Sequence, residues 1–172
     1  MNRQSSIFLI AALLPLLAPA AEPKPAAANA PAPRNGCIVL TTAAQQEKAV
    51  TAADGSSSKQ VLPATRVVPG TEVVWTTTAR NTCSRSADHV VIDQPVPEHM
   101  VFVADSAVGG GAQISLSVDG RDYQAASQLT ARNVDGSSRP ARATDVRFVR
   151  WTLTSAIAPQ DQFTARFRAV LQ

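Results

Sequence analysis

The amino-acid sequence predicts an all-β fold, a two-sheet β-sandwich of about seven to nine short strands. Three observations lead to this prediction. Short runs rich in β-branched and aromatic residues alternate between apolar and polar positions. Turn-forming Asp-Gly pairs at 54–55, 119–120 and 135–136 separate several of these runs. No long helical period appears after residue 20.

Eight runs are expected to form strands. The run that contains Pro63 is expected at a sheet edge, because proline has no N–H to donate to a neighbouring strand. Pro69 and Gly70 form a turn before the next run. Residues 119–143 are mainly polar and small, with one weakly apolar stretch at 125–131, which predicts a variable hairpin or loop, with a short helix as the alternative. The expected strands cover residues 37–45, 60–68, 72–80, 89–93, 100–104, 113–118, 146–154 and 162–171.

Alternation is clearest in the runs 72–80 and 162–171. One face of the first run is expected to carry Val73, Trp75, Thr77 and Ala79. One face of the second is expected to carry Phe163, Ala165, Phe167 and Ala169, with Thr164, Arg166 and Arg168 on the other. The tryptophans Trp75 and Trp151 are interpreted as core residues, with platforms for ligand stacking as the alternative.

The first 20 residues have the organisation of a cleavable signal peptide. Arg3 supplies the positive charge, residues 7–17 are apolar, and Ala18-Pro19-Ala20 forms a small-x-small cleavage site. The apolar stretch is shorter than the about 20 residues that a bilayer-spanning helix needs, and no second apolar run follows. The alternative is an uncleaved amphipathic or buried helix. We expect export to the periplasm or cell surface of a bacterium, with no membrane span after cleavage.

The rest of the chain divides into a linker and one domain. Residues 21–36 are rich in proline and alanine and predict a flexible linker, and residues 37–172 form the predicted β-sandwich domain. Arg3 is the one charged residue of the leader, so the mature chain has 15 basic and 13 acidic residues and a net charge of +2. This weak charge, without adjacent basic residues, indicates ordinary solvated arginines, and no nucleic-acid partner is expected.

Cys37 and Cys83 are the only cysteines of the chain. An even number of cysteines in an exported chain predicts a disulfide bond, because the compartment is oxidising. Two free thiols or an intermolecular bond are the alternatives. The pair has no C-x-x-C spacing, so redox catalysis is not expected. A Cys37–Cys83 bridge would clamp the first strand to the domain.

Residues 68–172 carry several motifs that recur in one bacterial family. These are Pro69-Gly70, Asn81-Thr82 at a strand end, the polar turn 84–87, and the Asp-x-Pro-x-Pro segment 93–97. Further along lie the strand 98–103 with Ser106-Ala107, the segments 117–120 and 149–153, and Ile157-Ala158-Pro159. In this combination the chain resembles domain of unknown function eleven, a bacterial conserved repeat domain.

The resemblance implies an immunoglobulin-like sandwich of exported and cell-surface proteins, and it implies no chemistry. That family often occurs in repeats, whereas this sequence holds one copy. The chain departs from the family pattern at two positions. Cys83 stands where relatives usually have glycine, and Pro159-Gln160 replaces the common Pro-Gly pair.

No catalytic or metal-binding constellation is predicted. His89 and His99 lie near Asp88, Asp93 and Glu98 in sequence, so a weak metal site is the alternative to surface and turn roles. Asp93 is expected to accept backbone hydrogen bonds in the turn before the prolines. A Ser-His-Asp triad has no G-x-S-x-G turn to present its nucleophile.

Two charged segments could indicate binding, of calcium in one case and of an acidic partner in the other. Residues 119–122 superficially suggest a calcium loop, but they lack the later acidic positions of one, so a tight turn is predicted. The last two strands carry Arg147, Arg150, Arg166 and Arg168. If those strands paired, their arginines could form one face for an acidic partner, and solvated strand faces are the alternative.

These observations predict an exported, non-enzymatic cell-envelope protein with a structural or binding role. No cofactor is expected, and the partner is expected to be another envelope protein or polymer. The alternative is a periplasmic accessory or chaperone-like module that pairs an exposed edge strand with a client chain, based on the broken run 60–68.

Overall fold

Antiparallel strands make up nearly all of the regular structure in the computed structural model of this chain. The structure describes residues 36–51 and 57–172, so the predicted signal peptide and nearly all of the predicted linker lie outside the described residues. The described part belongs to a unit that spans Asn35–Gln172. Its elements are β1 (Ile38–Thr51), β2 (Ser57–Pro63), β3 (Glu72–Asn81), β4 (Val91–Pro95), β5 (Met100–Phe102), β6 (Ala112–Ser117), β7 (Thr130–Arg132), β8 (Ser138–Pro140), the 3₁₀ helix η1 (Ala143–Asp145), β9 (Phe148–Leu153) and β10 (Gln162–Leu171).

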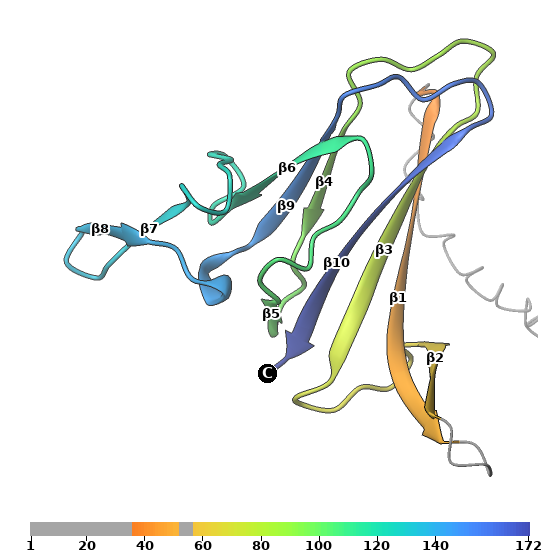
Figure 1. The fold of residues 1–172 in the computed structure, drawn as a ribbon. Coiled ribbons are helices and arrows are strands. Elements are labelled where there is room, and N and C mark those ends of the chain that lie inside the picture. The colour runs from red at the N-terminus through yellow and green to blue at the C-terminus, as the bar shows by residue number, and fades with distance from the viewer. Residues whose placement is uncertain (1–35, 52–56) are drawn as a thin grey trace, which may run out of the picture. The chain divides into compact units, whose positions relative to one another are not determined.

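The strands form two main sheets and a separate hairpin (Figure 1). One sheet has five strands in the order β2-β1-β3-β10-β5, and the other has three in the order β4-β9-β6. β7 and β8 pair only with each other. All pairs are antiparallel. The predicted all-β sandwich is therefore confirmed, and the described residues form ten strands rather than seven to nine.

The core lies between the two main sheets and is built on three aromatic rings. The Phe167 ring of β10 lies 6.4 Å from Trp151 of β9, which joins the two sheets, and 6.2 Å from Phe102 of β5. The Trp151 side chain is only 1% exposed, so its interpretation as a core residue is confirmed. Trp75 is partly buried and packs against the same core. Such tilted aromatic contacts add to the free energy of apolar burial.

The predicted alternation holds in β3 and β10. Ala165, Phe167 and Ala169 are buried, whereas Arg166 is exposed on the other face. The pairing Phe167↔Trp75 in the β3–β10 ladder places the two apolar faces side by side. A glycine closes the core nearby, because a Cβ at Gly109 would lie 2.8 Å from Trp151 Cδ1 and from Phe163 Cζ.

Several element bounds differ from the predicted ones. β1 continues through residues 46–51, which are mostly polar, because β2 pairs with that half of the strand. β2 is an edge strand as predicted, and its last residue, Pro63, lacks an N–H only on the side that faces away from β1, since Ala64 N–H still donates to the Ala44 carbonyl. The strand predicted to begin at His89 begins two residues later. Residues 119–143 contain the predicted hairpin, as β7 and β8.

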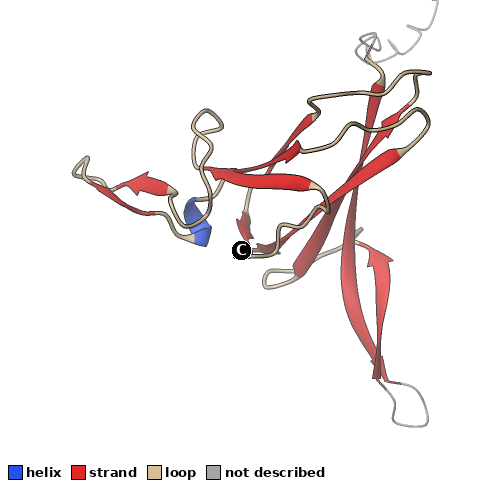
Figure 2. Ribbon diagram, turned by 45° about the horizontal axis from the view of Figure 1, so that its top comes forward, coloured by secondary structure: helices blue, strands red, loops and turns tan. Residues whose placement is uncertain are grey.

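Two parts of the domain extend from the sandwich (Figure 2). One is the hairpin formed by β2 and the C-terminal half of β1. The other is the β7–β8 hairpin, with η1 at its base. The segments that flank the second hairpin, through Leu129 and residues 141–146, line a cleft against the sandwich.

Candidate functional site

An apolar cleft of about 550 Å³ lies between the sandwich and the segment that carries the β7–β8 hairpin. Phe102 and Leu116 contribute its wall from the sandwich, where β5 and β6 are the outer strands of the two sheets. Leu129 and Val146, which flank the hairpin in sequence, contribute the opposite wall. All four side chains are nearly fully buried. The volume lies within the range of pockets that bind small molecules.

The cleft continues along the sandwich as a second cavity of about 220 Å³. Phe102, Asp105, Leu116 and Ala126 line both cavities. A few polar residues, Asp105, Ser127 and Arg142, also line the larger cavity. An elongated apolar groove with a few polar side chains suits a ligand with an apolar body and a polar group.

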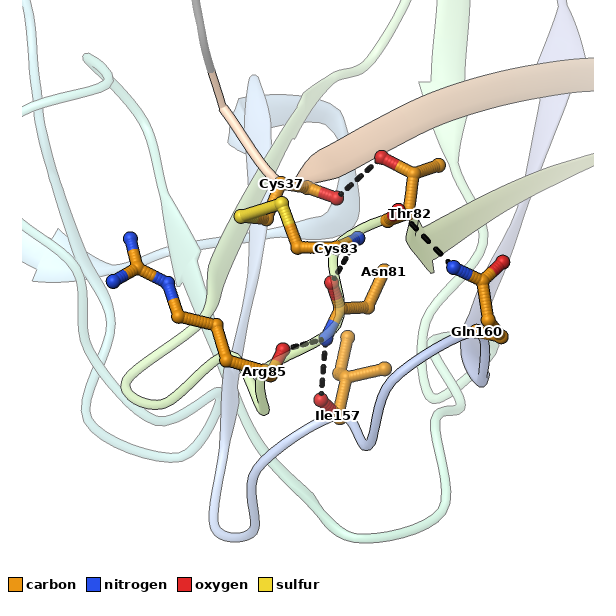
Figure 3. The surroundings of a disulfide bond; sticks show 7 residues. All are labelled: Cys37, Asn81, Thr82, Cys83, Arg85, Ile157 and Gln160. Atoms are coloured by element: carbon orange, nitrogen blue, oxygen red, sulfur yellow. Dashed lines mark hydrogen bonds between the residues drawn. A yellow bond between two sulfur atoms is a disulfide. The ribbon is translucent and has the colours of Figure 1, made fainter.

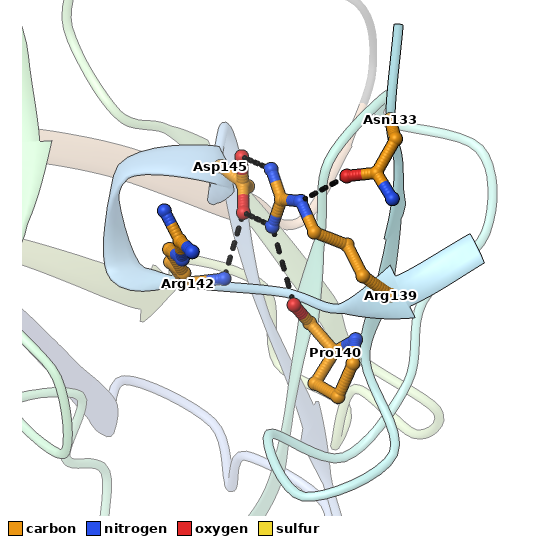
Figure 4. A network of polar contacts seen from close by, with 5 residues as sticks. All are labelled: Asn133, Arg139, Pro140, Arg142 and Asp145. Carbon is orange, nitrogen blue, oxygen red and sulfur yellow. Dashed lines mark hydrogen bonds and ion pairs between the residues drawn. The ribbon is translucent and has the colours of Figure 1, made fainter. Parts of the chain in front are cut away.

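A polar network fixes the base of the hairpin (Figure 4). Arg139 donates from two guanidinium nitrogens to the two carboxylate oxygens of Asp145, at 2.6 and 2.8 Å. Asp145 also accepts the Arg142 N–H at 2.7 Å, and Arg139 Nε donates to Asn133 Oδ1. The hydrogen bonds from Arg139 and then from Arg142 lower the pKa of Asp145 from 3.8 to about 2. The network holds η1 and the hairpin in one arrangement, so the cleft wall is preorganised.

The predicted tight turn at Asp119 is confirmed. Asp119 Oδ1 accepts the N–H groups of Arg121 and Asp122 at 2.9 and 3.1 Å, and the Ser117 hydroxyl donates to it at 3.0 Å. These hydrogen bonds lower the pKa of Asp119, those from the two backbone N–H groups most. Gly120 follows with a φ of 76°, which the turn requires. The carboxylate is therefore occupied by its own turn.

Asp93 has a different role from the one expected. Its carboxylate is paired with Arg150, whose Nε and Nη2 donate to it at 2.6 and 2.7 Å. The two residues are directly opposite in the β4–β9 ladder. The Arg150 guanidinium also lies 3.6 Å from the centre of the Tyr123 ring. The predicted turn interaction of Asp93 is wrong, because the register of the sheet offers the carboxylate a bidentate arginine.

The arginine face considered for an acidic partner does not form from paired strands. β9 and β10 lie in different sheets, so Arg150 and Arg168 are not on one sheet face. Arg168 pairs with Glu72 at 3.0 Å and with Glu47 at 3.6 Å. Arg147 precedes β9, and Arg147 and Arg166 are exposed.

The histidines lie in two exposed turns. His89 and His99 have positive φ angles of 54° and 61°, just before β4 and β5. Within residues 36–51 and 57–172, no group of three or more His, Cys, Asp or Glu side chains could hold a metal ion. The structure therefore does not bring Asp88, Asp93 and Glu98 together with them as a metal site.

The predicted Cys37–Cys83 disulfide is confirmed (Figure 3). It joins the residue before β1 to a residue two positions after β3, and these are neighbouring strands of one sheet. Asn81, which is fully buried, lies beside it. The Asn81 amide donates to the carbonyls of Arg85 and Ile157, and its Oδ1 accepts the Cys83 N–H. This clamp satisfies every side-chain polar group of a buried asparagine.

The fold and the bridge define a small, disulfide-bonded β-sandwich domain. No family profile matches the chain, and no curated protein or solved structure matches it significantly. The resemblance to the bacterial conserved repeat domain therefore stays a prediction. Among the described residues, no helix is long and apolar enough to span a membrane.

Sequence reasoning did not find the cleft. Its walls come from residues more than 40 positions apart, such as Phe102 and Val146, and neither residue stands out in sequence. The one available signal was the weakly apolar stretch 125–131, which supplies Ala126 and Leu129.

Proposed function

We propose that this chain is an exported, non-enzymatic binding protein of a bacterial cell envelope. The observation that carries the proposal is the preorganised cleft between the sandwich and the segments that flank the β7–β8 hairpin. Its buried apolar walls suit the non-covalent binding of an apolar molecule. The Cys37–Cys83 bridge supports an oxidising compartment, and the leader sequence supports export.

The binding site can be tested with a neutral apolar dye, N-phenyl-1-naphthylamine, titrated into the purified chain. We expect a saturable rise in fluorescence. Ala126→Trp would fill the groove from its rim and weaken dye binding by about tenfold or more, because it removes the space that the dye occupies. The matched control is Ala125→Trp, which changes a neighbour that is also exposed but lines neither cavity.

Two results would contradict the binding site. One is dye fluorescence that rises without saturation. The other is equal binding by the two tryptophan variants, which would place the dye elsewhere on the surface.

Export and the lack of enzymatic activity need separate tests. Cell fractionation with N-terminal sequencing should find a mature chain that begins at Ala21, outside the cytoplasm. A full-length chain in the cytoplasm would contradict export. Turnover of a defined substrate by the purified chain would contradict a purely binding role.

A second candidate function is pairing with a client chain at the edge of β2, which is the terminal strand of the five-stranded sheet. Because the ladder to β1 uses alternate residues, the N–H of Val61 points away from the sheet. Val61→Pro would remove that donor and should abolish capture of a client from envelope extract. Capture that survives Val61→Pro, or an extract that yields no strand-pairing partner, would count against this function.

A further inference from the structure

The N-terminal half of β1 is a free sheet edge. β2 covers the strand from Gln45 to Thr51, and Ala64 N–H donates to the Ala44 carbonyl at 2.9 Å. Residues 38–43 pair with β3 on one side, and on the other side no strand among residues 36–51 and 57–172 pairs with them. We call residues 38–43 the open edge.

The register shows which backbone groups point outward from the open edge. Thr82 N–H donates to the Cys37 carbonyl at 2.8 Å, so odd residues of β1 bond to β3. Ala44 bonds on the opposite side, to Ala64. Because an antiparallel ladder uses alternate residues, the N–H and C=O groups of Ile38, Leu40 and Thr42 point outward.

Two large apolar side chains of the open edge are exposed. Leu40 is 53% exposed and Val39 is 49% exposed, on opposite faces of the strand. Leu40 lies on the face that points toward the second sheet, the face on which Thr42 Oγ1 contacts Thr77 Oγ1 at 3.1 Å. The three-stranded sheet is two strands narrower, and it leaves Leu40 uncovered. The edge carries no charge, proline or bulge, the usual features that keep sheet edges apart.

We propose that the open edge pairs with the open edge of a second copy of this chain. Antiparallel pairing around a two-fold axis at Leu40 places Leu40 opposite Leu40, and Ile38 opposite Thr42. The outward N–H and C=O groups at these three positions then bond between the copies, and the two five-stranded sheets join into one. The proposal concerns a surface separate from the cleft, and it does not depend on the proposed ligand.

A second copy fits this edge in length and charge. The open edge is bounded by Cys37 at one end and by the Ala44–Ala64 hydrogen bond at the other. A two-fold axis centred on Leu40 pairs residues 38–42 of one copy with residues 42–38 of the other. The partner's β1 begins at Ile38, opposite Thr42, so the paired strand ends before the segment that β2 covers. Residues 36–46 contain no charged side chain, so no like charges meet in the antiparallel pair.

The size of the contact predicts a weak dimer. A single short ladder buries less surface than the about 1,200 Å² of a small stable interface. We therefore expect a reversible, concentration-dependent dimer. Sedimentation equilibrium of the full chain under oxidising conditions, at concentrations up to roughly 1 mM, covers the weakest affinity that such an interface is expected to have.

Charge exchange at the two-fold axis tests the arrangement. Leu40→Lys and Leu40→Glu each place like charges directly opposite each other, and each should raise the dissociation constant about tenfold or more. An equal mixture of the two variants should recover the dimer, because Lys then lies opposite Glu. The matched control is Val61→Lys, since Val61 has the same 53% exposure but lies on β2, outside the open edge. It should dimerise like the wild type.

Each outcome decides the proposal. Dimerisation of the wild type, its loss in both Leu40 variants and its recovery in their mixture would support it. A wild type that remains monomeric at all these concentrations would overturn it. So would a dimer that the Leu40 variants do not disrupt, whether or not Val61→Lys disrupts it. Because Leu40 is exposed, circular dichroism should show both variants folded; unfolded variants would contradict the described exposure of β1 and overturn the argument.

Discussion

The Arg139 guanidinium donates two parallel hydrogen bonds to the Asp145 carboxylate across the base of the β7–β8 hairpin. Both side chains remain partly accessible to solvent. The pair therefore acts less through net electrostatic energy than through geometry, because a bidentate contact fixes the orientation of both groups. It sets the position of the hairpin and, through it, the wall of the cleft.

The first prediction concerns pH. The pKa of Asp145 is about 2 in the folded chain, below its ordinary value of 3.8. A lowered pKa in the folded state means that this stabilisation is complete above pH 3.8 and is lost as the pH falls through about 2. Asp145→Asn should remove that pH-dependent contribution and lower the melting temperature by a few degrees near neutral pH.

Thermal melts of the wild type and of Asp145→Asn from about pH 7 down to about pH 2, which spans the range where this stabilisation is complete and the range where it is lost, measure the effect. The control is Asp88→Asn, which changes an exposed carboxylate outside the hairpin. If the two variants gave the same pH profile, the Arg139–Asp145 pair would have no measurable role in stability.

The second prediction concerns the disulfide. Cys37 and Cys83 are 46 residues apart, and a bridge that closes a loop of this length stabilises the folded chain by about 4 kcal/mol in the chain-entropy model. The Cys37→Ala/Cys83→Ala double variant should lose that free energy of unfolding. Denaturation in guanidinium chloride, with and without a reductant, measures it. Reductant should have no effect on the double variant, and an equal effect on both proteins would disprove the assignment.

The third prediction concerns the core. Phe167→Ala should lower the free energy of unfolding by about 3–5 kcal/mol, because it empties the space between the two sheets. Phe167 contacts both Trp151 and Phe102, so both rings lose a packing partner. Urea denaturation measures the loss. The exposed Val134 offers a control, since Val134→Ala should leave the midpoint unchanged.

The fourth prediction concerns a turn. Gln160 has a φ of 64°, in the left-handed region that glycine adopts without cost. Gln160→Gly should therefore be more stable than Gln160→Ala by about 1 kcal/mol. Both variants lose the same side-chain hydrogen bond, from Gln160 Nε2 to the Thr82 carbonyl at 3.1 Å, so their difference reports the backbone alone. Equal unfolding midpoints would show that the turn carries no such strain.

Runs that alternate between apolar and polar residues allowed correct prediction of strands and of their buried faces. Phe167 and Ala169 alternate with arginines so regularly that both strand and buried face could be predicted. Pro63 marked an edge because its chemistry forbids an inner position. The cysteine pair followed from the expected compartment and an even count.

The remaining features depend on pairing that local patterns do not contain. Asp93 and Arg150 meet because β4 and β9 are neighbours in one register, and the two residues are 57 positions apart. The polar half of β1 lacks an apolar alternation, and its strand conformation comes with its partner β2. The cleft likewise needs both sheets and the hairpin in place.

The Cys37–Cys83 bridge also determines how the domain responds to mechanical force. Tension on the chain ahead of Cys37 would otherwise peel β1 from β3 one hydrogen bond at a time, beginning at the Cys37 carbonyl, which accepts the Thr82 N–H. The covalent bond instead passes the load to Cys83, just after the C-terminal end of β3, a strand whose other side is held by β10. A pull from this end must therefore move two paired strands together, so more force is needed to open the domain from its N-terminal end.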